Sequence, residues 1–389
     1  MTDQQGEVDE CDVLILGGSF TGIELVRRLR RDRVGRALRI RVVDRQREHL
    51  YIPLGHELLC ERLPFGVEAG TVLASARYVD ELGPELAWIQ AEVTGFDPST
   101  RTLTRAEGRP IRARFVVFCL GSEVRPPASL PGGERLLAYK SAAEFERAHD
   151  VLRREGSVLI VGGGITGVEI AGELAHATRL KVTMIHAGSR LLPGLCERAG
   201  LEALAGLRAQ GVEVLLDTRL LEFGESSATI RGPAGERRLA ADLGFWAGGL
   251  QPPPVIASLG LARDRGGWLI VDPQLQCGEG LFAGGDLARI YERPDAPEPW
   301  PTMQRAIEGI FAASTIATNI LALVRGKPLR RHRLWSDFPH GVSMGARSLV
   351  VFGPIVVGAA RLNIWFRRFL MRQYMRRYRG RHRASSPTS

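Results

Sequence analysis

The amino-acid sequence predicts an α/β fold with two Rossmann-like, three-layer dinucleotide-binding domains and a C-terminal segment that faces a membrane. Two glycine-rich turns, Gly17–Gly22 and Gly162–Gly167, each follow a short apolar run and precede a segment with helical periodicity. This order of strand, turn and helix is the context in which such turns cradle a pyrophosphate. The third observation is an arginine-rich C-terminal segment with regularly spaced aromatic residues.

The size and composition of the chain suit two or three globular domains. It has 389 residues, of which 44% are hydrophobic, and a formal net charge of +9. The polar and acidic residues 1–11 run directly into the first apolar segment, which predicts a cytoplasmic protein without a signal peptide. The five cysteines have neither metal-ligand spacing nor a close pair, so we expect no metal site and no redox-active disulfide.

The first glycine turn lies between an apolar strand at 12–16 and a helix at 23–29. Its glycines allow a tight turn, the approach of a pyrophosphate and close helix packing, although Ser19 stands at the second fingerprint glycine. The next strand, 38–43, ends at Asp44, where an acid accepts adenosine ribose hydroxyls; an ordinary solvated carboxylate is the alternative. The residues expected to contact this dinucleotide are Gly17, Gly18, Ser19, Phe20, Thr21, Gly22 and Asp44.

The second turn fits the fingerprint fully and lies between a strand at 157–161 and a helix at 168–174. The following strand, 181–185, ends at His186 instead of an acid, so the choice between NADH and NADPH stays open. An acid would favour NADH, whereas His186 with Arg190 leaves room for NADPH; solvated loop residues are the alternative. The residues expected to contact this nucleotide are Gly162, Gly163, Gly164, Ile165, Gly167 and His186.

The positive charge is concentrated at the C-terminus, because ten arginines and no acidic residue follow Asp337. Residues 348–360 are apolar, but they are too few to span a bilayer and are interrupted by Gly353 and Pro354, which predicts a strand, a turn and a strand. A basic amphipathic helix is predicted over 361–379, with arginines on one face. Its apolar face consists of Leu362, Trp365, Phe366, Phe369, Leu370 and Tyr374.

The interleaved aromatic residues of this helix favour peripheral attachment to a membrane, where each arginine near anionic lipid contributes about 1 kcal/mol. We therefore expect the protein on the inner face of the cell membrane. Two alternatives remain. The helix could dock against a second copy in a homodimer, or the residues after Gly380 could form a basic tail that binds nucleic acid without specificity. No specific nucleic-acid partner is expected.

Five further sequence blocks strengthen the interpretation of the two turns. They are Tyr51-Ile52-Pro53-Leu54, Ala91-Glu92-Val93-Thr94-Gly95, Cys119-Leu120-Gly121, Phe245-Trp246-Ala247-Gly248-Gly249 and Phe282-Ala283-Gly284-Gly285-Asp286. Together with the turns, they make residues 10–330 resemble the glutathione-reductase-like flavoproteins with two dinucleotide-binding domains. Within that class the chain is most similar to the type II NADH dehydrogenases and the apoptosis-inducing-factor-like oxidoreductases.

The resemblance implies FAD at the first turn and NADH or NADPH at the second, with hydride transfer to FAD and electrons passed to a membrane quinone without ion pumping. It implies an FAD-binding domain at 8–150 and 251–328, an NAD(P)H-binding domain at 155–250 and a C-terminal segment at 329–389. It adds further residues expected near the cofactors, which are Pro53, Val93, Gly121, Gly248, Gly285, Asp286 and Met303.

Three residues are candidates for catalysis. By resemblance, Glu169 lies near the nicotinamide or the flavin edge and orients it or handles a proton, although the helix dipole also favours a glutamate there. A helix opening at Thr302 would direct its positive end at the reduced flavin.

Related quinone reductases have two glutamines at the start of this helix. Here the first is Gln304 and the second is replaced by Glu308, which puts quinone use in question; a solvent-facing pair is the alternative.

The remaining alternatives differ in the electron acceptor. Sulfide:quinone oxidoreductases and disulfide reductases need suitably placed cysteines, and the five present here form no such set. An apoptosis-inducing-factor-like or ferredoxin-reductase-like flavoprotein with a non-quinone acceptor stays open. So does a nucleotide-sensing flavoprotein whose basic tail contacts nucleic acid.

Overall fold

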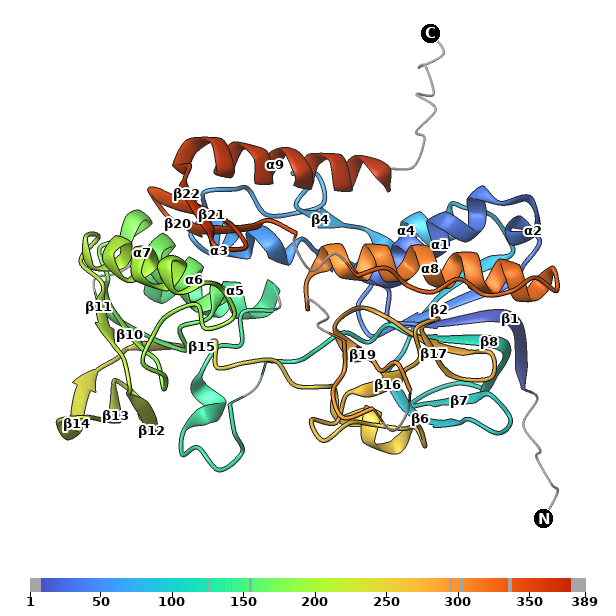
Figure 1. Ribbon diagram of the computed structural model, residues 1–389, viewed down its shortest axis with the longest axis horizontal. Helices are drawn as coiled ribbons and strands as arrows, with labels where there is room; N and C mark the ends of the chain where they lie inside the picture. Colours follow the sequence, from blue (N-terminus) through green and yellow to red (C-terminus); the bar gives the residue numbers. More distant parts are fainter. Residues whose placement is uncertain are drawn as a thin grey trace, which may run out of the picture.

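The computed structural model describes residues 8–124, 126–140, 142–153, 156–293, 296–300, 304–334 and 338–378. Two sheets, one around each glycine turn, lie toward opposite ends of the molecule, and the C-terminal helix extends from the smaller sheet's side toward the larger sheet (Figure 1). The structure confirms the predicted α/β class with two Rossmann-like units.

The larger sheet is built from two separated parts of the chain, in the strand order β17-β18-β8-β1-β2-β5. At its centre, β1 (Asp9–Leu16) pairs in parallel with β2 (Ile40–Asp44) and with β8 (Ile111–Phe118). The distant strand β18 (Leu281–Ala283) pairs in parallel with β8, so the chain returns to complete this sheet. The other strands are β5 (Leu86–Gln90), β6 (Val93–Asp97), β7 (Thr102–Arg105) and β17 (Gln276–Gly278).

The central strands of the larger sheet, β1, β2 and β8, are largely buried, as expected of a sheet that other elements cover on both faces. The helix α1 (Phe20–Arg31) leaves the first turn directly and packs against α8 (Ala306–Val324). Among the described helices, α8 is the one long and apolar enough to cross a bilayer, but 50% of its most apolar window is buried inside the molecule. This burial against α1 indicates a core helix.

The smaller sheet has the order β11-β10-β9-β15, and all of its neighbouring strands are parallel. Two of its strands coincide with the predicted segments, β9 (Ser157–Val161) and β10 (Lys181–Ile185). The helix α6 (Ile165–Ala177) follows the second turn. The remaining elements of this unit are β11 (Glu213–Leu215), β15 (Leu243–Trp246), α7 (Glu197–Arg208) and an antiparallel sheet of β12 (Arg219–Phe223), β13 (Ser227–Gly232) and β14 (Gly235–Ala240).

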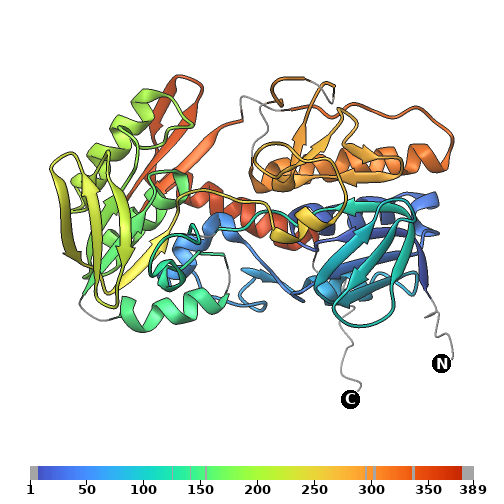
Figure 2. The ribbon, with the colours of Figure 1, turned by 90° about the horizontal axis from the view of Figure 1, so that it is seen from below.

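The C-terminal segment consists of an antiparallel sheet and a long helix. The predicted strand, turn and strand is confirmed as β21 (Arg347–Phe352) and β22 (Ile355–Gly358), to which β20 (His340–Met344) adds a third strand. The predicted basic helix is α9 (Ala360–Arg377). Because β20 packs on α6 and α9 packs on β20 and β21, this segment is attached to the smaller unit, and Figure 2 shows α9 running along the middle of the molecule.

Short elements complete the described part of the chain. They are α2 (Arg33–Arg36), β3 (His49–Leu50), η1 (Ile52–Leu54), α3 (Gly55–Leu59), β4 (Val72–Leu73), α4 (Ser75–Asp80), η2 (Gly133–Arg135), α5 (Ala142–Leu152), η3 (Pro254–Ser258), β16 (Leu269–Val271), η4 (Gly285–Leu287) and β19 (Ala288–Ile290). The helix expected to open at Thr302 begins at Ala306, after an N-cap at Arg305, and Thr302 lies outside the described residues.

Candidate functional site

The first glycine turn is so tight that a side chain at two of its positions would collide with backbone atoms. Gly17 has a φ of +102°, and a Cβ atom there would lie 2.3 Å from the carbonyl oxygen of Cys119. A Cβ atom on Gly22 would lie 1.9 Å from the carbonyl oxygen of Gly17. These contacts explain the glycines at the first and third positions of the motif.

The second turn repeats this geometry. Gly162 has a φ of +121°, a Cβ atom there would lie 2.3 Å from the carbonyl oxygen of Ala247, and a Cβ atom on Gly167 would lie 1.9 Å from the carbonyl oxygen of Gly162. Around a Cβ placed on Gly164, none of the described residues has a heavy atom within 4 Å. Open space therefore lies where a pyrophosphate approaches the backbone, so the turn fits a dinucleotide.

Each turn donates one backbone N–H to the residue at the end of the following strand. Gly18 donates to Asp44 Oδ2 at 2.7 Å, and Gly163 donates to His186 Nδ1 at 3.1 Å. Burial raises the pKa of Asp44, partly offset by the N–H groups of Gly18 and Gln46, and lowers the pKa of His186. The two strand-end residues predicted as ribose contacts therefore occupy equivalent places, next to their turns.

The residue that departs from the fingerprint, Ser19, has a partner of its own. Its Oγ lies 2.7 Å from Nδ1 of His49, a buried residue whose pKa burial lowers to about 3. The neighbouring Phe20 packs its ring against His49 and against Tyr374 of α9, with centroids 4.3 and 5.0 Å apart. The first turn is therefore held between β3 and the C-terminal helix.

A cluster of polar side chains lies beyond the end of β8, around the predicted flavin ligand Asp286. Ser122 Oγ donates to Asp286 Oδ2 at 2.6 Å, and Lys140 Nζ donates to both the carbonyl oxygen and Oγ of Ser122 at 2.8 Å. Burial lowers the pKa of Lys140, and Asp286 opposes that shift. The structure thus gathers a carboxylate, a hydroxyl and a half-buried cation from three separate parts of the chain.

The two residues predicted to contact the electron acceptor, Gln304 and Glu308, have different hydrogen-bond partners near the start of α8. Gln304 Nε2 donates to the backbone carbonyl of Asp286 at 3.1 Å. Glu308 is 4% exposed, and its Oε1 lies 2.6 Å from Nε2 of His332, whose Nδ1 lies 2.9 Å from Oγ1 of Thr315. The alternative of a solvent-facing Glu308 is therefore wrong, because α8 packs this side inward.

Glu169 lies where four segments of the chain meet. It belongs to α6, and its Oε1 accepts from the backbone N–H of Ser343 at 3.1 Å and from Arg367 Nη1 at 2.5 Å. Its Oε2 lies 3.6 Å from Nδ1 of His56, a histidine of α3 whose pKa burial lowers to about 3. Arg367 also donates to the carbonyl of Pro53, which links the second module to the first.

The predicted division of α9 into an arginine face and an apolar face is partly wrong. The sequence placed its arginines opposite the apolar face, on the polar side, but Arg367 is directed inward to Glu169, and Arg368 Nε donates to buried Glu57 at 2.7 Å. Burial acts to lower the pKa of Arg367, but Glu169 outweighs it and the pKa rises. Tyr374, predicted among the outward apolar residues, is 4% exposed and packs on the first turn.

The outward face of α9 is nevertheless apolar. The exposed large side chains are Leu362, Trp365, Phe366, Phe369 and Leu370, and the adjoining β21–β22 hairpin adds Phe352, Ile355 and Val357. Trp365 and Phe369 stack with centroids 5.6 Å apart. Exposed apolar patches of this kind mark interaction surfaces.

The other residues predicted to contact the cofactors are mainly packed against neighbouring parts of the chain. Val93 is buried at the start of β6, Ile165 opens α6, and a Cβ atom on Gly248 would meet the ring of Trp246. Thr21 brings the first turn close to Gly285, since a Cβ atom on Gly285 would lie 2.7 Å from Thr21 Oγ1. Gly121 has a positive φ of +69°. Met303 lies outside the described residues.

Some contacts of this site carry no sequence signal. Lys140 lies 18 residues from Ser122, to which it donates, and the helical period that pointed to Tyr374 does not predict its contact with Phe20. Ser122 directly follows the block that ends at Gly121, so its position beside a strand end could have pointed to it. Long-range contacts of this kind follow from the packing of the two sheets and α9.

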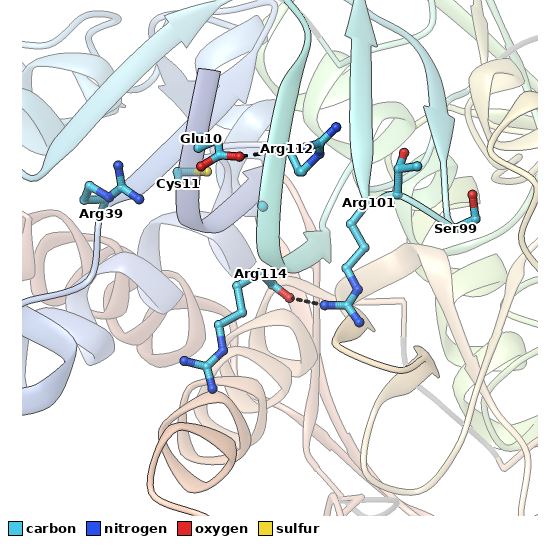
Figure 3. Close-up of a pocket in the computed structure, with 9 residues that line it drawn as sticks. Glu10, Cys11, Arg39, Ser99, Arg101, Arg112 and Arg114 are labelled. Atoms are coloured by element: carbon cyan, nitrogen blue, oxygen red, sulfur yellow. Dashed lines mark hydrogen bonds and ion pairs between the residues drawn. The ribbon is translucent and has the colours of Figure 1, made fainter. Parts of the chain in front are cut away.

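A surface pocket of about 360 Å³ lies away from the glycine turns. It is lined by Glu10 and Cys11 near the start of β1 and by Arg112 and Arg114 of β8, whereas the first turn follows the end of β1. Figure 3 shows these arginine side chains pointing in different directions. The pocket is therefore not part of the nucleotide site.

The cysteines and other metal-binding side chains form no cluster in the part of the chain that the structure describes. No group of three or more His, Cys, Asp or Glu residues there is placed to hold a metal ion. All five cysteines are free, and burial raises the pKa of Cys11 and of Cys277 to about 12. These two thiols therefore stay protonated at neutral pH.

Known proteins are similar to this chain in sequence and in fold. Residues 11–312 match the family described as pyridine nucleotide-disulphide oxidoreductases. The type II NADH:quinone oxidoreductase of Haemophilus influenzae is 28% identical over 375 residues, which cover 82% of this chain and 82% of that protein. The demethylphylloquinone reductase NdbB of Synechocystis is 29% identical over 338 residues, which cover 82% of this chain and 80% of that protein.

Among solved structures, NDH2 from Plasmodium falciparum superimposes with a TM-score of 0.80 and covers 96% of both chains. At 12% identity this likeness concerns the fold alone. It includes part of the C-terminal segment, which lies beyond the residues that match the family.

Proposed function

Because the chain belongs to the pyridine nucleotide-disulphide oxidoreductase family, we propose that it is a flavoenzyme that oxidises NADH or NADPH and reduces a membrane quinone. The pair of equivalent glycine turns carries this proposal, since it supplies separate sites for FAD and for the donor nucleotide. The names of the relatives from Haemophilus and Synechocystis support a quinone as acceptor. The predicted class of enzyme, an oxidoreductase that uses a pyridine nucleotide, is confirmed by the family.

The residues around the first turn would hold FAD. Asp44 accepts from Gly18 and Gln46, yet its two oxygens have further lone pairs for ribose hydroxyls. Ser122 and Lys140 beside Asp286 supply a hydroxyl and a half-buried cation that offsets negative charge on the cofactor. Bound FAD would supply the redox chemistry, as acceptor of a hydride and donor of electrons.

Glu169 is the proposed residue for proton handling. It lies on α6 just after the donor turn, and Arg367 connects it to the carbonyl of Pro53 on the FAD side. Reduction of a quinone to a quinol consumes protons, so a carboxylate at this junction can deliver or accept one. Ser343 and Arg367 fix its orientation through hydrogen bonds.

Gln304 and Glu308 take different parts in the proposal. Gln304 uses one of its two amide hydrogens on the carbonyl of Asp286, so the second can be donated to a quinone carbonyl. Glu308 is committed to His332, and its role is to hold this buried histidine against α8. The glutamate at this position is therefore accommodated by a buried histidine partner.

The acceptor would be reached at the membrane surface. The outward face of α9 and the β21–β22 hairpin present large exposed apolar side chains, of which Leu362 is 68% and Trp365 59% exposed. Full burial of one such side chain contributes about 1.5–3 kcal/mol, and each arginine near anionic lipid adds about 1 kcal/mol. These terms suffice for peripheral attachment at the cytoplasmic face.

The redox half of the proposal is tested on the purified protein. We expect a flavin spectrum that bleaches anaerobically with NADH or NADPH and returns when a soluble quinone analogue is added. Glu169→Gln should lower quinone turnover at least tenfold, within the range of general acid–base effects. The matched control is Glu213→Gln, which removes a glutamate paired with Arg237 on the surface. Failure to retain flavin overturns the proposal, and flavin that stays reduced with quinone eliminates the acceptor.

The membrane half is tested with liposomes that contain anionic lipid. Replacing Trp365 and Phe366 by serine should lower the bound fraction at least tenfold, because both side chains are exposed on the outward face of α9. Leu201→Ser is the control, since Leu201 is equally apolar and 60% exposed but belongs to α7. Equal binding of both variants would count against α9 as the membrane contact.

A further inference from the structure

At the donor turn, His186 performs the structural task of Asp44 without the spare acceptors of a carboxylate. In the first module, Asp44 Oδ2 accepts from Gly18 at 2.7 Å and Oδ1 accepts from Gln46 at 2.8 Å. Two carboxylate oxygens offer about four lone-pair sites. Asp44 can therefore brace its turn and still accept hydrogen bonds from a ribose.

His186 has no such reserve. Its Nδ1 accepts from the N–H of Gly163 at 3.1 Å, and a neutral imidazole has a single acceptor nitrogen. The proton of the ring then lies on Nε2, which can only donate. A ring that accepts at Nδ1 is the neutral form, and burial favours that form because it lowers the pKa of His186, although the backbone of Arg190 and the charge of Asp217 oppose the shift.

The arginine that follows His186 is committed to its own loop. Arg190 Nη1 donates to the carbonyls of Leu192 and Leu195 at 3.3 and 3.1 Å, and Nη2 donates to the carbonyl of Pro193 at 2.6 Å. The sequence suggested that Arg190 could accompany His186 at a 2′-phosphate. In the structure, the guanidinium of Arg190 instead donates to carbonyls of the loop after β10. Of the two residues, His186 is then the one that bears on the preference between NADH and NADPH.

We infer that His186 makes the donor site permissive, so that the protein uses NADH and NADPH with similar efficiency. This inference rests on the proposed function and specifies its donor. A neutral ring that donates does not repel the 2′-phosphate of NADPH and does not accept from the 2′-hydroxyl of NADH, whereas a carboxylate at this strand end does both. The turn tolerates the histidine because one acceptor for the N–H of Gly163 is sufficient.

The test measures anaerobic flavin reduction, which isolates the donor half of the reaction. Initial rates at low donor concentration give the ratio of the efficiencies with NADH and NADPH, which we expect to lie within tenfold. His186→Asp should raise the preference for NADH at least tenfold. His186→Asn keeps a neutral acceptor for Gly163 and should leave the ratio near that of the wild type. Ser189→Asp is the matched control, because it adds the same charge at an exposed loop position.

Two results would overturn the inference. One is a wild-type preference of more than tenfold for either nucleotide. The other is a shift of the ratio by Ser189→Asp as large as that by His186→Asp, since the charge of the loop rather than the strand-end position would then decide. If NADH alone bleaches the flavin, the proposed function stands and the inference falls. If neither nucleotide bleaches it, the proposed function itself falls.

Discussion

At the first turn the strand-end partner of the backbone is the carboxylate of Asp44, and at the second it is the imidazole of His186. The glycines of both turns meet equivalent backbone contacts, and a Cβ atom on the third glycine would lie only 1.9 Å from the carbonyl oxygen of the first in each case. The comparison shows that each turn needs one acceptor for its backbone N–H, and that either a carboxylate or an imidazole can serve. The preference for a ligand then depends on the lone pairs of that acceptor that the turn does not use.

The modules also differ in how they are covered. The C-terminal helix lies on the first turn through the ring of Tyr374, and Tyr378 donates to buried Glu24 of α1 at 2.7 Å. The donor turn leaves open space beside Gly164 among the described residues. Under the proposed function, this difference suits a resident FAD in the first module and a nucleotide that exchanges in the second.

Removing α9 should break the comparison most severely. A chain that ends at Gly358 leaves Glu57 and Glu169 without their arginine partners, and an unpaired buried charge costs about 3–5 kcal/mol. Two such losses approach the whole stability of a domain, about 5–15 kcal/mol. We expect no flavin to survive gel filtration, whereas a chain that ends at Tyr378 keeps it. Flavin retained by the shorter chain would show that α9 does not close the first module.

Arg367→Gln should have the next largest effect, because this arginine links the two modules. The variant leaves Glu169 buried beside a neutral side chain and should lower the free energy of unfolding by about 3–5 kcal/mol. Urea unfolding measures the loss. Combining it with Glu169→Gln should recover part of the loss, since no buried charge then remains unpaired. Strictly additive losses would mean that the two residues do not act as a pair.

Asp44→Asn should affect cofactor binding in the first module alone. The amide still accepts from Gly18 but lacks the charge, and a hydrogen bond to a charged group contributes about 1.5–3 kcal/mol. Flavin affinity should therefore fall roughly tenfold to a hundredfold, as measured by fluorescence titration of the apoprotein. His186→Asn is the matched change in the second module and should leave flavin affinity unaltered. Equal losses in both variants would contradict the assignment of FAD to the first turn.

The pH dependence should sharpen the comparison by a smaller amount. Burial lowers the pKa of His49 and His56 from 6.5 to about 3. Because protonation favours the unfolded chain, their contribution to stability is complete above pH 6.5 and is lost as the pH falls toward 3. Each costs roughly 1.4 kcal/mol per pH unit within that range. Urea unfolding at pH 7, 6 and 5 should show a shallower decline for His49→Gln, and an unchanged decline would place the sensitivity elsewhere.

Parts of the site could be predicted because their causes are local. The strands β9 and β10 and both glycine turns follow from apolar runs and from backbone positions that only glycine can occupy. The strand-end places of Asp44 and His186 follow from the spacing of a strand, turn, helix and strand. The apolar face of α9 follows from its helical period, although the period does not say which neighbours its arginines meet.

The sequence by itself therefore determined the two nucleotide modules, their order and the amphipathic character of the C-terminal helix. Only the tertiary structure decided that Arg367 turns inward to Glu169, that Lys140 joins Ser122 near Asp286 and that Glu308 is buried with His332. Each of these contacts joins groups from separate elements. Their positions depend on how the two sheets and α9 pack, which no local spacing records.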